Sequence, residues 1–157
     1  MESIREVIKL FESFNLKKIF DDIMKELSNE IIKLNQVEQL AEGIDALDQR
    51  IKTISAEEQR QGNVYSVFTI QERKAKGLQT DNVDLKVDGT FWKTFKVVKV
   101  SGGWQVQANF NVHGEDINDN FDSKYDFTGL TDNNLEVLVF NSIMPRLEIR
   151  IRQHFKI

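Results

Sequence analysis

The stretch Val83-Asp-Leu-Lys-Val-Asp-Gly-Thr-Phe-Trp-Lys-Thr-Phe-Lys-Val-Val-Lys-Val-Ser-Gly-Gly-Trp-Gln-Val-Gln-Ala-Asn-Phe-Asn-Val112 decides the fold. Apolar and polar side chains alternate from Val83 to Val87 and strictly from Trp104 to Val112, which is the period of a strand with one dry and one solvated face. Gly102 and Gly103 separate the two longest runs and predict a hairpin turn. We therefore expect antiparallel strands over 83–112, with an amide-rich solvated face.

The residues before this stretch have a helical period. Apolar residues recur every three or four positions over 1–35, and charged residues fill the other face. The phase is lost near Ser13 and Asn15. This pattern predicts a short helix up to about Phe14 and a longer one from about Asn15 to Leu34, and a single bent helix is the alternative.

The residues after the strands end in another helical pattern, over 131–155. Thr131 is a good N-cap, and Asp132 follows in the first turn. Pro145 either kinks this helix or opens a second helix at its first turn. The order of helices, strands and helix predicts one α+β domain over 1–157, with helices packed on a mainly antiparallel sheet.

Two connecting segments are less regular. Residues 36–55 fit either a continued helix or a turn followed by a short strand, because Gly43 interrupts the helical pattern and 50–54 alternate. Residues 57–82 are polar and contain Gly62 and Gly77, which predicts a long arm or loop.

Composition excludes several classes of protein. The chain has 157 residues, a formal net charge of −4 and no cysteine. Disulfide scaffolds, thiolate metal sites and cysteine nucleophiles are therefore ruled out. The acidic balance argues against a protein that coats nucleic acid with its whole surface. The sequence shows no signal-peptide pattern and no apolar run long enough to span a bilayer, so we expect a soluble protein of intracellular origin.

Catalytic and metal-binding patterns are weak. The acidic loop over 113–125 has the alternating oxygen ligands of a calcium loop, but Phe121, Lys124 and Phe127 occupy positions where an EF-hand needs a glycine and ligands. His113 and His154 form no metal-ligand pair, and phosphate-loop and nucleophile-elbow motifs do not occur. The sequence predicts a non-enzymatic protein, with no catalytic, cofactor or metal residue.

Two basic groups are candidates for contact with phosphate or a charged partner. One lies in the predicted arm, at Arg73, Lys74 and Lys76, and the other in the last helix, at Arg146 and Arg150 with Arg152. A solvated surface is the simpler interpretation of both groups.

Short motifs across the chain resemble those of small bacteriophage proteins for head–tail joining and tail completion. They are Gln39-Leu40-Ala-Glu-Gly43-Ile-Asp45, Thr69-Ile-Gln-Glu-Arg-Lys74-Ala-Lys-Gly77, the run with Leu85, Gly89, Phe91 and Phe95, and Lys124-Tyr-Asp-Phe-Thr-Gly-Leu-Thr131. Asp88 and Asp126 depart from the family pattern, which has threonine and glycine there. The resemblance implies a hairpin-like conformation for 40–54.

The resemblance also implies a structural role in the virion, after synthesis in the host bacterial cytoplasm. Such proteins form rings of identical subunits through heterologous contacts. The expected partners are further copies, other neck, portal or tail proteins, and genomic DNA passing transiently through the lumen. The expected subunit-contact residues are Tyr65, Phe68, Arg73, Lys74, Lys76, Arg146 and Arg150.

Two other functions remain open at this point. A small-ligand or nucleic-acid binding module would use a pocket lined by aromatic residues of the strands, namely Phe91, Trp92, Trp104 and Phe110. A hydrolase would need two of the many carboxylates to pair in a cleft, and the sequence does not single out such a pair.

Overall fold

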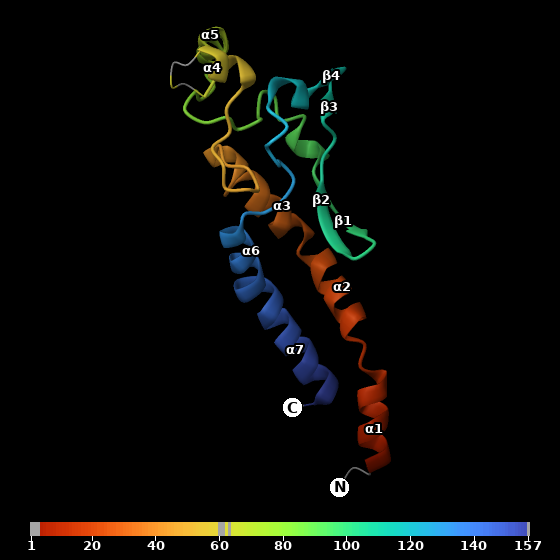
Figure 1. Cartoon of the computed structure of the whole chain (residues 1–157). Coiled ribbons are helices and arrows are strands. Elements are labelled where there is room, and N and C mark those ends of the chain that lie inside the picture. The colour runs from red at the N-terminus through yellow and green to blue at the C-terminus, as the bar shows by residue number, and fades with distance from the viewer. Residues whose placement is uncertain (1–3, 60–61, 63, 157) are drawn as a thin grey trace.

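The computed structural model describes residues 4–59, 62 and 64–156. The fold is α+β, as the sequence predicted. Figure 1 shows a slender helical stalk, formed by 4–36 and 132–155, with both ends of the chain at its free tip. A wider head, formed by the described residues of 40–95 and by 108–130, lies at the other end, and a hairpin over 96–107 lies along the stalk.

The N-terminal half of the stalk consists of α1 (Ile4–Ser13), α2 (Leu16–Glu26) and α3 (Ser28–Gln36). The predicted break near residue 14 is confirmed: the Asn15 side chain caps α2 by accepting from the Lys18 backbone N–H at 2.8 Å. The longer predicted helix is divided at Leu27, whose own backbone N–H still binds the Ile23 carbonyl.

The C-terminal half of the stalk consists of α6 (Asp132–Leu138), the π-helical turn η4 (Val139–Ile143) and α7 (Met144–Phe155). Thr131 is the N-cap, as predicted, and accepts from the Asn134 backbone N–H. Pro145 lies in the first turn of α7, so it opens a helix, where its missing N–H costs no hydrogen bond.

The two halves of the stalk pack side by side, α2 against α7 and α3 against α6 (Figure 1). Ile23, Leu27 and Ile31 are buried on one side of this interface, and Leu138 and Ile143 on the other. Burying these aliphatic side chains stabilises the stalk by roughly 1.5–3 kcal/mol each. Two polar links lock the register of the halves, from Arg150 to Glu26 and from Ser142 to Glu30.

The strands form two separate two-stranded hairpins, where the sequence predicted one sheet. They are β1 (Lys96–Val100) with β2 (Gly103–Gln107), and β3 (Asn111–Val112) with β4 (Glu115–Asp116). The turn at Gly102 and Gly103 is confirmed by the pairing of Val100 with Gly103. β1 packs on α3, and Trp104 donates from Nε1 to Asp21 on α2.

Three parts of the predicted strands adopt other conformations. Val83–Val87 is irregular because Leu85 has a left-handed φ of 53° and the Asp84 side chain is drawn into a buried ion pair. Trp92–Thr94 forms the 3-10 turn η2. Residues 108–110 leave the ladder because the Asn109 backbone N–H binds the Thr94 hydroxyl.

The open segment 36–55 is mostly turns. η1 (Leu40–Glu42) ends at Gly43, which has a φ of 73°, and a single antiparallel bridge joins Ile44 to Arg50. This bridge is the only hairpin-like pairing found in the described part of 40–54. The buried carboxylate of Asp45 holds the turn by accepting from the backbone N–H groups of Leu47 and Gln49.

The predicted arm over 57–82 is wrong in one respect, since it contains helical residues. α4 (Ile54–Gln59) ends within its first residues, and α5 (Val67–Ala75) lies inside it; residues 60, 61 and 63 of the predicted arm lie outside the described residues. α5 begins at Ser66, whose hydroxyl accepts from the Thr69 backbone N–H. The acidic loop forms the 3-10 turn η3 (Ile117–Asn120), which is capped by the carboxylate of Asp116.

Two buried amides join the head to the stalk. The Asn35 side chain donates to the carbonyls of Phe127 and Gly129, and the Gln39 side chain donates to Gly129 and accepts from the Thr131 backbone N–H. Both amides are at most 1% exposed. The segment before α6 is therefore fixed to the end of α3 by hydrogen bonds shielded from water.

Candidate functional site

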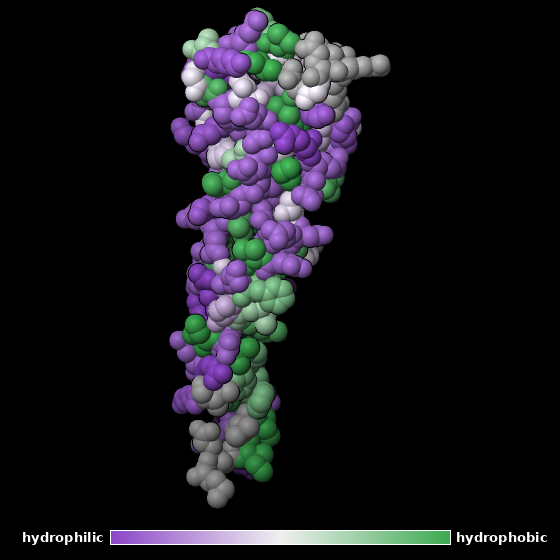
Figure 2. All heavy atoms as spheres, turned by 90° about the vertical axis from the view of Figure 1, so that its left-hand side faces the viewer, coloured by the Kyte–Doolittle hydropathy of each residue, from purple (hydrophilic) through white to green (hydrophobic). Residues whose placement is uncertain are grey.

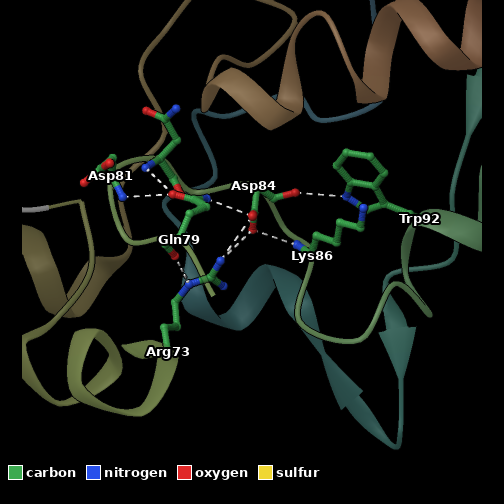
Figure 3. A network of polar contacts seen from close by, with 7 residues as sticks. Arg73, Gln79, Asp81, Asp84, Lys86 and Trp92 are labelled. Atoms are coloured by element: carbon green, nitrogen blue, oxygen red, sulfur yellow. Dashed lines mark hydrogen bonds and ion pairs between the residues drawn. The ribbon is translucent and has the colours of Figure 1, made fainter. Parts of the chain in front are cut away.

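The head is organised around a buried ion pair between Arg73 of α5 and Asp84. Arg73 donates from Nη2 to both carboxylate oxygens at 3.1 Å and from Nε to the Gln79 carbonyl at 2.7 Å (Figure 3). Asp84 also accepts from the Gln79 side chain and the Lys86 backbone N–H. With these added partners, the desolvated charges are compensated, which a buried pair requires.

Aromatic residues complete this network. Trp92 donates from Nε1 to the Asp84 carbonyl at 2.9 Å, and the Lys86 ammonium lies 4.8 Å from the Trp92 ring centre (Figure 3). The Arg73 guanidinium lies 4.7 Å from the centre of the Tyr65 ring. Burial, and then the nearby Asp84 carboxylate, raise the pKa of Tyr65 to about 12. Its buried hydroxyl has no hydrogen-bond partner among the described residues.

A half-open cavity of about 470 Å³ lies beside this network. One wall is α5, with Thr69, Glu72 and Lys76, and the opposite wall is the segment from β3 to η3. The floor is apolar and consists of Val83, Leu85, Phe91, Val112, Ile117 and Phe121. This combination of an apolar floor with a polar mouth is typical of sites that bind an apolar group.

Asp88 and His113 close one side of the mouth. The Asp88 carboxylate lies 2.9 Å from His113 Nε2. Its hydrogen bonds from Thr90, and next the one with His113, lower the pKa of Asp88 to about 2. Asp88 is therefore ionised at neutral pH. With Glu72 and Glu115, it gives the mouth three carboxylates beside the ammonium of Lys76.

Two non-glycine residues of the cavity have left-handed backbones. Leu85 has a φ of 53° and His113 a φ of 56°, which costs roughly 1–2 kcal/mol for an L-residue. The hydrogen bonds of Asp84 and Asp88 hold the chain on either side of Leu85. The shape of the cavity is thus maintained against local backbone strain.

A second feature is an apolar surface on the stalk. On α1, Ile4, Ile8 and Phe11 recur at helical spacing and are half or more exposed. On η4 and α7, Phe140 and Met144 are also half or more exposed. The Phe11 and Phe155 rings lie 4.9 Å apart, so α1 contacts the last turn of α7 at the tip, whereas Phe140 and Met144 lie near the other end of α7. Figure 2 shows hydrophobic residues gathered toward the tip of the stalk.

The total surface is large for this mass. The chain exposes 10345 Å², whereas a compact monomer of its mass exposes about 8,100 Å². The excess of about 2,200 Å² reflects the elongated shape, and it is larger than the roughly 800 Å² that each partner buries in a standard protein interface. The subunit therefore has enough surface for an interface of that size.

The seven predicted subunit-contact residues lie in two places. Tyr65 and Arg73 are buried in the head network, while Phe68 and Lys74 of α5 and Lys76 at its C-cap are exposed. Arg146 donates to the Ser142 carbonyl, and Arg150 binds Glu26 across the stalk. Tyr65 and Arg73 are thus buried within the subunit, Arg146 and Arg150 are partly exposed and also bind groups of their own chain, and the subunit contact of all seven residues stays a prediction.

Of the four aromatic residues predicted to line one pocket, only Phe91 lines the cavity. Trp92 donates to the Asp84 carbonyl, Trp104 donates to Asp21 of α2, and Phe110 packs between Phe91 and Phe127. The cavity instead takes its other apolar residues from the irregular segment after α5 and from β3 to η3. Their convergence depends on tertiary structure, and no spacing in the sequence indicated it.

Over residues 4–59, 62 and 64–156, no cluster of three or more histidine, aspartate or glutamate side chains is placed to hold a metal ion. No helix in the same ranges has the length and apolarity needed to cross a membrane.

The comparisons with known proteins found no relative. The chain matches no protein-family model, and neither a curated protein nor a solved structure matches it.

Proposed function

We propose that this chain is a non-enzymatic structural subunit that works by self-association. The observation that carries this proposal is the apolar surface of the stalk, with Ile4, Ile8 and Phe11 on α1 and Phe140 and Met144 on η4 and α7. Large apolar side chains exposed together on one face of a helix are typical of an interaction site. The excess surface area of the isolated subunit supports the same conclusion.

Within this class, the sequence motifs favour a bacteriophage adaptor at the head–tail interface or the tail end. In this proposal, identical subunits form a closed ring, which then contacts neck, portal or tail proteins. The protein is made in the host bacterial cytoplasm and is carried in the virion. An elongated subunit suits this role because its stalk and head offer different surfaces to the two neighbours in a ring.

The first experiment measures the assembly state of the purified full chain. We expect native mass spectrometry and sedimentation velocity over a concentration series to show one discrete oligomer larger than a dimer. A monomer at every concentration would contradict self-association. Quantitative mass spectrometry of particles from the source of the gene then tests the placement, since a neck or tail-end ring requires a low, fixed copy number.

The cavity in the head supports a second candidate function, a module that binds a small apolar ligand. Phe91 lies in the floor of the cavity, and Trp92 is held next to it by the Asp84 carbonyl. Tryptophan fluorescence of the wild type can be measured against a panel of apolar ligands. The Leu85→Trp and Val112→Trp variants, in which a larger side chain fills the cavity, are the controls. A change of fluorescence with a ligand in the wild type, but not in these variants, would favour this candidate.

A further inference from the structure

α1 carries an exposed apolar face at the tip of the stalk. Ile4, Ile8 and Phe11 are spaced i, i+4 and i+7, so they lie on one side of the helix. Their exposed fractions are 80%, 50% and 65%. α7 holds the C-terminal part of α1, where His154 Nε2 lies 2.9 Å from the Leu10 carbonyl. In Figure 1, α1 extends beyond the end of α7, so its apolar face is accessible to a partner.

One flank of this face carries an ordered pair of charges. Arg5 and Glu12 are seven residues apart, which is close to two helical turns. Both side chains therefore project from the same flank, roughly 10 Å apart along the helix axis. Both are exposed, and Lys9 lies further round the helix from the apolar face. The flank is thus basic toward the N-terminus of α1 and acidic toward its C-terminus.

Such a flank is complementary to a second copy of itself. When two helices pair antiparallel about a two-fold axis, like flanks lie side by side and run in opposite directions. With Ile8 next to the axis, Ile4 of one copy lies opposite Phe11 of the second copy. In this register Arg5 faces Glu12 of the second copy, and the symmetry repeats the ion pair on the same side of the contact.

Other orientations and occupants fit the charges of α1 less well. In a parallel pair, Arg5 would face the opposite flank of the second copy, which carries Leu10 and no charged residue beside the apolar face. Helices that lie on a lipid surface are typically rich in basic residues. α1 has two basic and two acidic residues, namely Arg5, Lys9, Glu6 and Glu12. A second copy in antiparallel orientation is therefore the favoured occupant.

We propose that two copies pair tip to tip through antiparallel α1 helices, with the apolar face of Ile4, Ile8 and Phe11 buried between them and Arg5 opposite Glu12 in both directions. The two stalks then run in opposite directions, so the heads lie at the far ends of the pair. This inference rests on the proposed self-association and specifies one of its contacts.

The symmetry of this contact limits what it can build. A two-fold contact joins only two copies. An oligomer larger than a dimer therefore uses a second contact as well, for which the stripe of Phe140 and Met144 is exposed.

Charge reversal tests both the pairing and its orientation. Arg5→Glu places two carboxylates against each other on the contact, and Glu12→Arg places two guanidinium groups against each other. We expect each variant of the full chain to self-associate about tenfold more weakly than the wild type at low ionic strength, measured by sedimentation velocity over a concentration series. An equimolar mixture of the two variants re-forms both ion pairs, so it should associate as the wild type does.

The controls separate this effect from a loss of folding. Both positions are exposed, and both changes agree with the helix dipole, so circular dichroism should be unchanged. Lys33→Glu makes the same change of charge as Arg5→Glu at an exposed position of α3, and it should leave association unchanged. Recovery in the mixture is a result that two misfolded variants would not give.

The other outcomes separate the pairing from the proposed function. Wild-type association of both reversal variants, or a mixture that recovers nothing, would overturn the pairing while self-association stands. A wild type that stays monomeric at every concentration would overturn both. If this monomer binds phosphatidylcholine vesicles and Ile8→Ser abolishes the binding, α1 docks on lipid and the pairing is again overturned.

A cross-link tests the contact without changing its charges. The sequence has no cysteine. Ile8→Cys places a thiol next to the proposed two-fold axis, so mild oxidation of the assembled protein should give a disulfide-linked dimer. Glu6→Cys, on the opposite side of α1, is the matched control and should stay unlinked. An oligomer of Ile8→Cys that forms no disulfide would overturn the pairing.

Discussion

At the scale of single residues, Gly129 occupies a position where no side chain fits. A Cβ there would lie 2.7 Å from the Cβ of Ala46. The chain cannot move away easily, because the Gly129 carbonyl accepts from the buried amides of Asn35 and Gln39. We expect Gly129→Ala to destabilise the protein by about 1–3 kcal/mol in urea unfolding, the usual cost of overpacking.

A second substitution should relieve the clash between the new methyl group at position 129 and Ala46. Ala46→Gly removes the opposing methyl group, so the double variant should recover part of the stability lost in Gly129→Ala. Additive effects of the two substitutions would show that the two residues are not in contact.

The buried phenol of Tyr65 predicts a loss of stability in alkali. Its pKa is raised from 10.0 to about 12 in the folded protein. The unfolded chain therefore ionises first, so the stabilisation is complete below pH 10 and disappears as the pH rises toward 12. The free energy of unfolding lost over this pH range is on the order of 2 kcal/mol. Urea unfolding at several pH values should show this loss in the wild type and a smaller loss in Tyr65→Phe.

Residues such as Arg73 show why sequence patterns miss part of a site. A basic run on a polar segment predicted a solvated surface, yet Arg73 is 5% exposed and Lys74 and Lys76 beside it are exposed. The difference is made by Asp84 and Gln79, which meet Arg73 only after the chain has turned back. No spacing within the run distinguishes the buried arginine from its neighbours.

At the scale of elements, α5 depends on its N-cap. The Ser66 hydroxyl accepts from the Thr69 backbone N–H at 3.1 Å, and α5 carries Arg73 into the head network. Ser66→Ala should lower the free energy of unfolding by about 0.5–2 kcal/mol. Ser66→Asp keeps an acceptor in place and is the control. Equal stability of Ser66→Ala and the wild type would show that the cap does not matter.

Elements with a strong period were predictable, and elements made by tertiary contacts were not. The stalk helices and the β1–β2 hairpin follow from 3.6- and 2-residue periods. α5 lacks a clean apolar stripe, since Val67 and Phe68 are exposed and adjacent. Val83 to Val87 alternates like a strand. No strand forms there, because Asp84 makes an ion pair with Arg73 and Leu85 has a left-handed backbone conformation.

At the scale of the whole molecule, the α+β class of the fold was predictable, but its elongated shape was not. A pattern of apolar residues indicates which face of a helix or strand is buried. It does not indicate whether that face is buried within the same subunit or against another one. Ile4 and Ile8 of α1 fit the helical period as well as Ile23 and Leu27 do, yet only the latter two are buried. This difference is the basis of the proposed self-association.

The exposed stripe of η4 and α7 should therefore matter for assembly and not for folding. Phe140 is 67% exposed and Met144 50%, so Phe140→Ser with Met144→Ser removes little buried contact within the subunit. We expect an unchanged Tm for the dissociated subunit at high dilution and at least tenfold weaker self-association in sedimentation equilibrium. Leu138→Ser, 2% exposed on the preceding helix, is the contrast and should lose stability by about 2–5 kcal/mol. If the double variant unfolds like Leu138→Ser, or associates like the wild type, this stripe is not part of the subunit contact.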